Sequence, residues 1–242
     1  EIMPSLVGSE MCIRDREKYM SSHPHGARAA SSKKSTPQKR DPEATSQALL
    51  DAAVVEFSEH GFAGARVDRI AAIAGANKQL VYHYFGNKDE LYRITLERVY
   101  KQIRDREQEL HLSDLQPVAA METLIAFSFD YLAEHPEFIA MLNDENRLGA
   151  PHLKASENVA NMHSPLVKLI EETLARGIEA GVFNDRFGPV NLYLSIAGLS
   201  YFYFSNQNTL SVIFERDLGS PAQIARRRQH VIDFAMAAIM SK

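Results

Sequence analysis

The chain has 242 residues, 45% of them hydrophobic, and carries a formal net charge of −4 at pH 7. This length and apolar content are sufficient for one large core, or for a small domain beside a larger one. The only cysteine is Cys12, which excludes a disulfide framework and a cysteine-based zinc site within one chain, and the expected location is the reducing cytoplasm.

Residues 1–40 are predicted to form an N-terminal extension without regular structure. Residues 1–19 do not begin with Met and resemble translated adaptor or assembly sequence, so we expect them to be non-native and Met20 to be the initiator. The basic arm, residues 26–40, contains five Lys or Arg residues and no acidic residue. Its Ser, Ala and Pro content is typical of a segment that stays disordered until it binds phosphates or a minor groove. A solubilising tail is the alternative interpretation.

Residues 41–87 are predicted to form a small N-terminal domain of three helices. The first helix has apolar residues at helical spacing and a glycine stop, namely Leu49, Leu50, Ala53, Val54, Phe57 and Gly61. The second has an apolar face made of Val67, Ile70, Ala71 and Ala74. Gly75 then permits a tight turn, and Asn77 is a suitable N-cap for the third helix.

The third helix has two different faces, because residues three or four apart lie on the same side. One face is apolar and consists of Val81, Tyr84 and Phe85. The other face is polar and consists of Lys78, Gln79, Tyr82 and His83. These four side chains provide donors and acceptors that reach phosphate oxygens and base edges when a helix lies in a major groove. The negative net charge does not exclude this function, because attraction to DNA depends on where the positive charges lie.

The stretch from Asp41 to Val99 resembles the DNA-binding end of the TetR family of bacterial regulators. The shared features are the glycine turn, a tyrosine-rich recognition helix, a Phe-Gly link and the sequence Asn-Lys-Asp-Glu-Leu at the start of a further helix. The resemblance implies a helix-turn-helix regulator, in particular a repressor that a small effector releases from a palindromic operator in double-stranded DNA.

The resemblance also assigns roles to individual residues of the recognition helix. It implies that Lys78, Gln79 and His83 lie over bases, and that Tyr82 and Lys88 hold phosphates. The sequence departs from the family at Arg66, where a Ser or Thr usually caps the second helix. An arginine contacts the same phosphate by its charge, but it cannot cap the helix.

Residues 88–242 are predicted to form a larger helical body, which makes the chain all-α with about nine helices. Asn87 and Glu90 resemble a capping pair before a long helix that runs towards Leu110. Further helices are expected over residues 117–135, 137–148, 152–181, 192–206 and 222–240. We expect Pro165 to kink or divide one of these helices, and Ser220 to cap the last one.

Aromatic and Met side chains of the body are sufficient to line a pocket between its helices. The candidate ligand-binding residues are Phe127, Tyr131, Phe138, Met141, Met162, His163 and Tyr201. The competing interpretation is that these residues belong to the core or to a subunit interface. We expect a small, mostly apolar or aromatic effector of unknown identity, and no cofactor.

A homodimer is expected because a palindromic operator needs two reading heads. The last two predicted helices carry apolar residues on more than one side, and in TetR-like proteins these helices form a four-helix dimer interface. An alternative is a DNA-binding helical protein that responds to a protein partner and has no small ligand.

An enzyme is the other alternative, and the sequence offers little for it. His152 and His163 would lie ~16 Å apart along one helix, too far to share a metal ion. There is no glycine-rich phosphate loop, no HExxH motif and no nucleophile elbow. We therefore expect no catalytic or metal site. No apolar run reaches the ~18 to 20 residues that span a bilayer, so no membrane partner is expected either.

Overall fold

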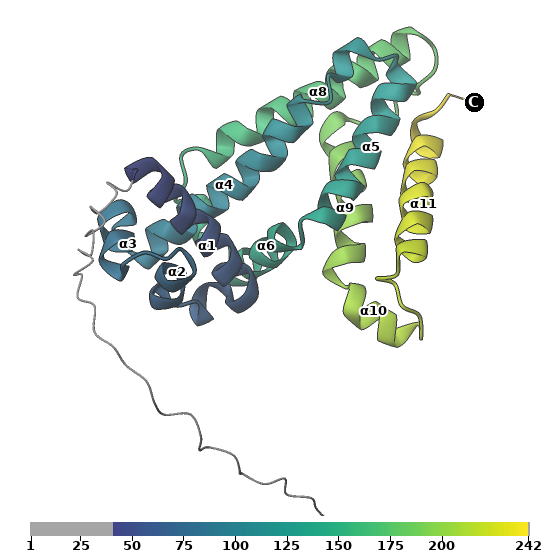
Figure 1. The fold of residues 1–242 in the computed structure, drawn as a ribbon. Coiled ribbons are helices and arrows are strands. Elements are labelled where there is room, and N and C mark those ends of the chain that lie inside the picture. The colour runs from purple at the N-terminus through teal and green to yellow at the C-terminus, as the bar shows by residue number, and fades with distance from the viewer. Residues whose placement is uncertain (1–40, 242) are drawn as a thin grey trace, which may run out of the picture. The chain divides into compact units, whose positions relative to one another are not determined.

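The computed structural model describes residues 41–241, apart from the side chains of residues 159–165, and the expectations for residues 1–40 lie outside this range. Within it the chain forms eleven α-helices, one short 3-10 helix called η1, and no strand (Figure 1). The elements are α1 Pro42–Gly64, α2 Val67–Ile73, α3 Lys78–Phe85, α4 Lys88–Gln108, η1 Leu112–Asp114, α5 Pro117–Glu134, α6 Pro136–Leu148, α7 Pro151–Lys154, α8 Val159–Glu179, α9 Pro189–Ser205, α10 Gln207–Ile213 and α11 Pro221–Ile239.

The all-α prediction is confirmed, and the additional elements are short. The four-residue helix α7 is too short to have a recognisable periodicity, and it depends on a distant side chain. The buried carboxylate of Glu145 accepts hydrogen bonds from the backbone N–H groups of His152 and Leu153, at 2.8 and 3.0 Å. These bonds satisfy amides that have no partner inside so short a helix.

Two local expectations differ from the structure. The helical segment expected over residues 152–181 is divided before Val159 into α7 and α8, whereas Pro165 does not divide α8, although a proline supplies no amide for the backbone ladder. At the start of α11, Ser220 and Pro221 occupy the expected N-cap and first positions. The Ser220 hydroxyl, however, donates to the carbonyl of Asp217 at 2.8 Å and does not cap the helix.

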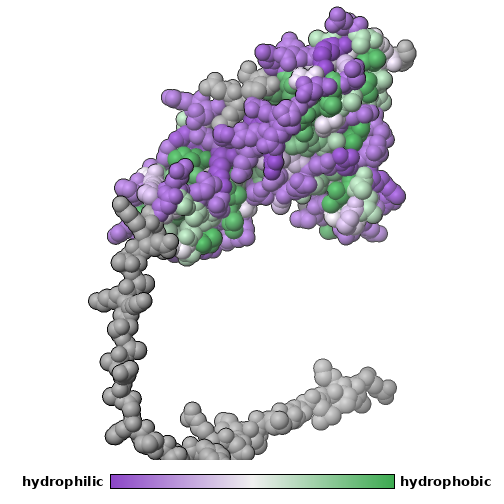
Figure 2. All heavy atoms as spheres, turned by 45° about the horizontal axis from the view of Figure 1, so that its top comes forward, coloured by the Kyte–Doolittle hydropathy of each residue, from purple (hydrophilic) through white to green (hydrophobic). Residues whose placement is uncertain are grey.

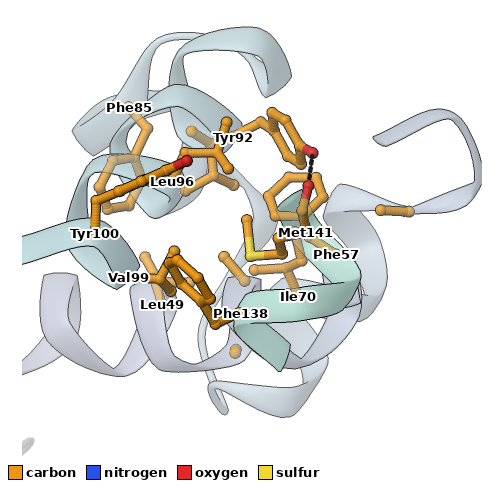
Figure 3. Close-up of a cluster of buried hydrophobic side chains, with 14 of the residues drawn as sticks. Leu49, Phe57, Ile70, Phe85, Tyr92, Leu96, Val99, Tyr100, Phe138 and Met141 are labelled. Carbon is orange, nitrogen blue, oxygen red and sulfur yellow. Dashed lines mark hydrogen bonds between the residues drawn. The ribbon is translucent and has the colours of Figure 1, made fainter. Parts of the chain in front are cut away.

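A first hydrophobic core joins the N-terminal helices to part of the body. It contains side chains from α1, α2, α3, α4 and α6, among them the fully buried Leu49, Phe57, Ile70, Tyr92 and Met141 (Figure 3). Phe57 of α1 and Tyr92 of α4 pack edge to face, with ring centroids 4.8 Å apart. Because α4 and α6 belong to this core, helices that were assigned to different domains pack as one unit.

A second hydrophobic core holds the remaining helices of the body together. It is built mainly from α5, α8, α9 and α11, with Phe129, Ile170, Ile196 and Val231 at its centre. The two cores meet along α5, where Tyr131 and Leu132 belong to the first and Ile125 and Phe129 to the second.

The α1 backbone bends at Gly61, three residues before the end of the helix. Gly61 has φ +64 and ψ 174, a combination that residues with a Cβ rarely adopt. A Cβ at this position would also lie 3.0 Å from Oδ1 of Asp144 on α6. The bend directs the next backbone N–H, that of Phe62, to Oδ2 of the same aspartate at 2.6 Å. The predicted helix stop at Gly61 is therefore a kink, after which α1 continues to Gly64, and the partner of the kinked backbone is Asp144 on α6.

This geometry gives a stability test with a matched control. Gly61→Ala should lower the free energy of unfolding by about 1 to 3 kcal/mol, because it combines a strained φ with the close approach to Asp144. Gly64→Ala, in a helical part of α1 where a Cβ meets only ordinary contacts, should change it by less than about 0.5 kcal/mol. Urea unfolding of both variants measures the difference. Equal effects would contradict a specific role for the bend.

Candidate nucleic-acid interface

The helices α2 and α3 form the predicted helix-turn-helix. Between them Gly75 has φ +59, which lets the chain turn within a few residues. Asn77 then caps α3, because its Oδ1 accepts the backbone N–H of Gln79 at 2.9 Å. Asn87 caps α4 in the same way through the N–H of Glu90 at 2.8 Å. Both predicted asparagine caps are confirmed.

A buried glutamate of α1 orients α2. Glu56 is 1% exposed, and its Oε1 accepts the backbone N–H of Arg66 at 2.7 Å and the Nε of Arg69 at 2.8 Å. Arg66 itself makes no side-chain cap on α2, as predicted. The glutamate therefore binds the amide at the N-cap position that the usual Ser or Thr would occupy. The sequence reasoning missed Glu56, although a charge inside the apolar stripe between Ala53 and Phe57 is a signal for such a role.

The recognition helix α3 has the predicted division of faces. Val81 and Phe85 are buried in the first core, and Tyr84 is half-buried beside them. On the opposite side, all four predicted polar residues are exposed, namely Lys78, Gln79, Tyr82 and His83. One apolar face thus holds the helix, while the polar face is open to a partner.

Three charged side chains meet at the edge of this polar face. Asp68 of α2 lies 2.5 Å from the Nζ of Lys78 and 3.6 Å from Nη2 of Arg66. The hydrogen bond between Asp68 and Lys78 lowers the pKa of the aspartate and raises the pKa of the lysine, so both side chains remain charged at neutral pH. Asp68 was not among the predicted site residues. Because Asp68 pairs with both Arg66 and Lys78, it competes with DNA for these two predicted contact residues.

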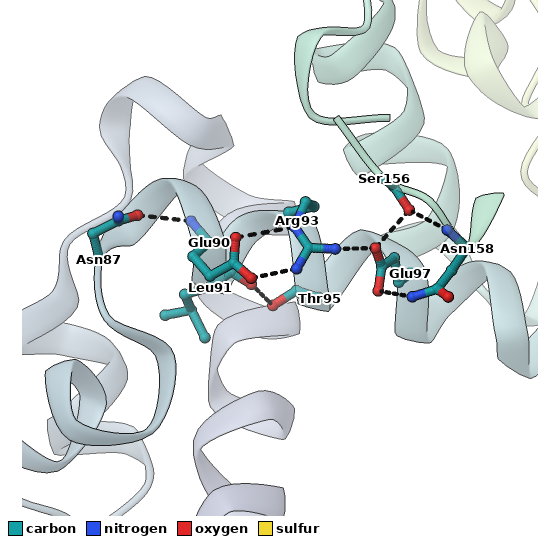
Figure 4. A network of polar contacts seen from close by, with 8 residues as sticks. All are labelled: Asn87, Glu90, Leu91, Arg93, Thr95, Glu97, Ser156 and Asn158. Carbon is teal, nitrogen blue, oxygen red and sulfur yellow. Dashed lines mark hydrogen bonds and ion pairs between the residues drawn. The ribbon is translucent and has the colours of Figure 1, made fainter. Parts of the chain in front are cut away.

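Lys88 begins α4, and its ammonium lies 5.0 Å from the centre of the Phe62 ring. The first turns of α4 are fixed by a chain of polar contacts (Figure 4). Arg93 binds both Glu90 and Glu97, and Glu97 accepts from the Ser156 hydroxyl at 2.5 Å and from the Asn158 amide at 3.1 Å. The start of α4 is therefore tied to the segment that precedes α8.

A cavity of about 310 Å³ lies among α4, α5, α6 and α9. Its walls include the aromatic side chains of Tyr100, Phe138, Tyr193 and Tyr201. Two charged side chains, Arg104 and Glu107 of α4, also line it. This volume is at the lower end of the range for sites that bury a small molecule.

Only some of the predicted ligand-binding residues line this cavity. Phe138 and Tyr201 line it, and the Tyr201 hydroxyl donates to Oδ1 of Asn143. Phe127, Tyr131 and Met141 instead belong to the packing around the first core, where Tyr131 stacks on His135 with centroids 4.1 Å apart. The side chains of Met162 and His163, on α8, lie outside the described residues.

The sequence reasoning missed Arg104 and Glu107. It predicted a long helix towards Leu110 without assigning it any ligand-binding residue, yet both residues continue the buried stripe of Tyr100 and Ile103 at steps of three and four residues. Charged residues at core positions of an otherwise apolar stripe are the signal that was available.

An apolar stripe lies on an exposed face of α9, where Leu194 and Gly198 also line the cavity. Val190, Leu194 and Phe202 are 53, 59 and 58% exposed and follow one another at multiples of four residues, with Gly198 between them. Phe234 of α11 is also 58% exposed. Figure 2 shows hydrophobic surface among the hydrophilic residues on the side of the molecule where these helices lie. Side chains of this size at regular spacing are typical of a surface that is covered by a partner.

A capped recognition helix with an exposed polar face, set on a helical body, defines the class of DNA-binding regulators with a helix-turn-helix. Residues 49–93 match the family described as bacterial regulatory proteins of the tetR family, and residues 117–235 match the tetracyclin repressor-like C-terminal domain. With the relatives described next, these matches show that the chain belongs to the TetR family of transcription regulators.

Similar proteins support this assignment. The HTH-type transcriptional repressor NicS of Pseudomonas putida is 34% identical over 191 residues, which are 79% of this chain and 90% of that protein. The repressor SCO4008 of Streptomyces coelicolor is 39% identical over 162 residues, 65% of this chain and 78% of that protein. A TetR transcription regulator from Haloarcula marismortui has the same fold, with a TM-score of 0.62 at 21% identity over 82% of this chain and 100% of that one. None of the described helices has the length and apolar character needed to cross a membrane.

The contact between Asp68 and Lys78 leads to a test of DNA affinity. Asp68→Asn should strengthen binding to duplexes of any sequence and make the salt slope steeper by up to about one unit, because it removes the carboxylate that compensates the positive charges of Lys78 and Arg66. Asp105→Asn is the matched control, since Asp105 forms an exposed ion pair with Lys101, also at 2.5 Å. This pair lies about 20 Å along α4 from the three N-terminal helices α1, α2 and α3, which together are called the head. Salt titrations by fluorescence anisotropy measure both. An unchanged slope in Asp68→Asn would contradict the competition.

Proposed function

We propose that the protein is a homodimeric cytoplasmic repressor that binds a palindromic operator and leaves it when a small molecule occupies the cavity among α4, α5, α6 and α9. The observation that carries the proposal is the exposed polar face of α3, held in place by a buried apolar face on the same helix. A surface helix with four hydrogen-bonding groups on one side suits the major groove.

In this proposal the predicted contacts have separate roles. Gln79, with Lys78 and His83, reads base edges, while Tyr82 and Lys88 bind phosphates. Arg66 binds a phosphate at the start of α2, where its exposed side chain is close to α3 through Asp68. Sequence specificity then comes from α3, and register on the duplex comes from the flanking cations.

The proposed dimer forms through the apolar stripe of α9 and the exposed Phe234 of α11. The occupant of this surface is a second copy of the chain, because two reading heads are needed for the two halves of a palindrome. A two-fold axis brings the same residues of both copies together, so the apolar stripe of one copy packs against the apolar stripe of the other.

Two helices extend from the cavity to the head. α6 contributes Phe138 to the cavity wall and, further along, Asp144 to the N–H of Phe62. Although burial opposes it, the hydrogen bonds from Phe62 and Arg147 lower the pKa of Asp144, which keeps this carboxylate charged. α4 lines the cavity with Tyr100 and begins at the head with Lys88. A ligand that shifts α4 or α6 therefore changes the orientation of the head.

The DNA-binding part of the proposal is tested by two substitutions with different expected effects. Duplexes selected from a random pool by the wild-type protein should contain a palindrome with half-sites about one helical turn apart. Gln79→Ala should weaken the free energy of operator binding by ~1 to 3 kcal/mol, mainly through lost discrimination between bases at one position of each half-site. Lys88→Ala should weaken all sequences alike and reduce the salt slope by about one unit.

Lys101→Ala, on an exposed part of α4, is the control for the charge change and should leave both affinity and slope unaltered. Binding of Lys88→Ala with the wild-type salt slope would rule out its phosphate contact. Uniform weakening by Gln79→Ala across all sequences would rule out base reading by this residue.

The dimer is tested by sedimentation. Phe202→Glu and Phe234→Glu should convert the dimer to a monomer with poor operator affinity, because each places two charges in an apolar symmetric interface. Ile73→Glu is the control, since Ile73 is 54% exposed on α2, away from the stripe, and this variant should remain dimeric. A wild-type protein that sediments as a monomer at micromolar concentration would contradict the proposed assembly.

A further inference from the structure

The cavity contains an ion pair that does not join two elements of the fold. Nη1 of Arg104 donates to Oε2 of Glu107 at 2.6 Å, and both residues belong to α4, three positions apart. Their side chains are 8 and 6% exposed. Removing two charges from water is expensive, and the cost is recovered only when the charges make enough contacts. A pair within one helix gives no tertiary link in return, so its place in the cavity wall needs another reason.

The guanidinium of Arg104 has donors available for a ligand. It carries five N–H groups in a planar fork that matches a carboxylate, and the described contact with Glu107 uses one of them. Arg104 lines the cavity together with aromatic side chains of α4, α6 and α9. The cavity therefore combines aromatic walls with a cationic fork.

The balance of charge in the cavity favours an anion. Burial raises the pKa of Glu107 to about 7, against the opposing influence of Arg104. The titratable groups around this carboxyl are Arg104 and Tyr100 on α4, Tyr131 on α5, and Tyr193 and Tyr201 on α9, and the α6 wall contributes the apolar Phe138 and Leu142. Burial raises the pKa of Tyr100, Tyr131 and Tyr201, so these three side chains are neutral at pH 7. Whenever Glu107 is protonated, the positive charge of Arg104 is uncompensated.

We propose that this cavity binds a small aromatic monocarboxylate, with its ring between the aromatic walls and its carboxylate on Arg104 in place of Glu107. The volume of about 310 Å³ suits a molecule with a single ring. As the effector, a role that rests on the proposed function, the carboxylate acts on α4 itself, because both charged residues lie on the helix that begins at the head.

The first experiment compares charged and neutral probes of the same shape. The full-length wild-type protein is titrated by calorimetry with benzoate, phenylacetate and 3-phenylpropanoate, and with the three corresponding primary amides. We expect at least one carboxylate to bind about 30-fold more tightly than its own amide, because a hydrogen bond between two charged groups is lost in the amide. Equal affinities in every pair, or no binding of any carboxylate up to about 10 mM, would overturn the proposal.

The second experiment assigns the effect to Arg104. Arg104→Gln should reduce the affinity for the best carboxylate by about 30-fold and leave the affinity for its amide unchanged. Arg106→Gln is the matched control, because Arg106 pairs with Glu109 three positions on, at 2.8 Å, with both side chains exposed. It should change neither affinity. Loss of both affinities to the same extent in a folded Arg104→Gln protein would contradict the assignment.

A third measurement does not depend on the folding of Arg104→Gln. A bound carboxylate beside Glu107 favours its protonated form, so binding takes up a proton above the pKa of about 7. The wild-type affinity for the carboxylate should therefore fall by up to about tenfold between pH 7 and pH 8. Glu107→Gln, which keeps Arg104 and cannot titrate, should bind with an affinity that is independent of pH in this range. A wild-type affinity without pH dependence would overturn the exchange of carboxylates.

Operator binding separates this proposal from the proposed function. If a carboxylate binds through Arg104 but leaves operator affinity unchanged, the cavity site is correct and the proposed release by its ligand is wrong. If operator affinity responds equally to a carboxylate and to its amide, the regulation is correct and the charge selectivity proposed here is wrong.

Discussion

The hydrophobic core that α1, α2 and α3 share with α4 and α6 is the constraint on which the other features depend. The head has too few residues to bury its apolar faces alone, and Leu96 of α4 and Met141 of α6 complete its interior. At the edge of this core, Asp144 binds the N–H of Phe62 where α1 bends. A protein interior has little free volume, so α4 and α6 cannot shift without moving the head.

Five charged side chains that are buried or half-buried fall into two groups according to what they bind. Glu56, Asp144 and Glu145 each accept backbone N–H groups from another element, and each thereby positions a helix start or a bend. These carboxylates act as distant helix caps and compensate for missing local ones. Arg104 and Glu107 differ, because they bind each other on one helix and face the cavity. The contrast is what separates a structural role from a ligand-binding one.

The sequence predicted the head well because its signals are local. The asparagine caps, the glycine turn and the two faces of α3 depend on residues within a few positions of one another, and all are found in the structure. The contact of Asp68 with Lys78 joins two helices and is not visible in periodicity. Glu56 could have been identified as unusual from the sequence, because it is a charge within an apolar stripe. Its partner, the backbone N–H of Arg66, could not, because their contact depends on how α1 bends.

The cavity was harder to predict because its walls come from four helices whose packing the sequence does not determine. Phe138 and Tyr201 were identified as lining residues, but Met141 was grouped with them although it is fully buried in the first core. An aromatic or Met residue at helical spacing has the same pattern in a core and in a cavity wall. Only tertiary packing distinguishes them, and the same packing buries the charged side chain of Arg104 in the cavity wall.

The central claim is that the cavity and the DNA-reading head are coupled through α4 and α6. Coupling between two binding sites is reciprocal, so operator DNA must change the affinity for a cavity ligand by the same factor by which the ligand changes operator affinity. Calorimetric titration of the wild-type dimer with the best aromatic carboxylate, with and without a saturating selected operator, measures this factor directly. We expect the two affinities to differ by about 5- to 150-fold, with weaker binding when the operator is present. Equal affinities in the two titrations would contradict the account.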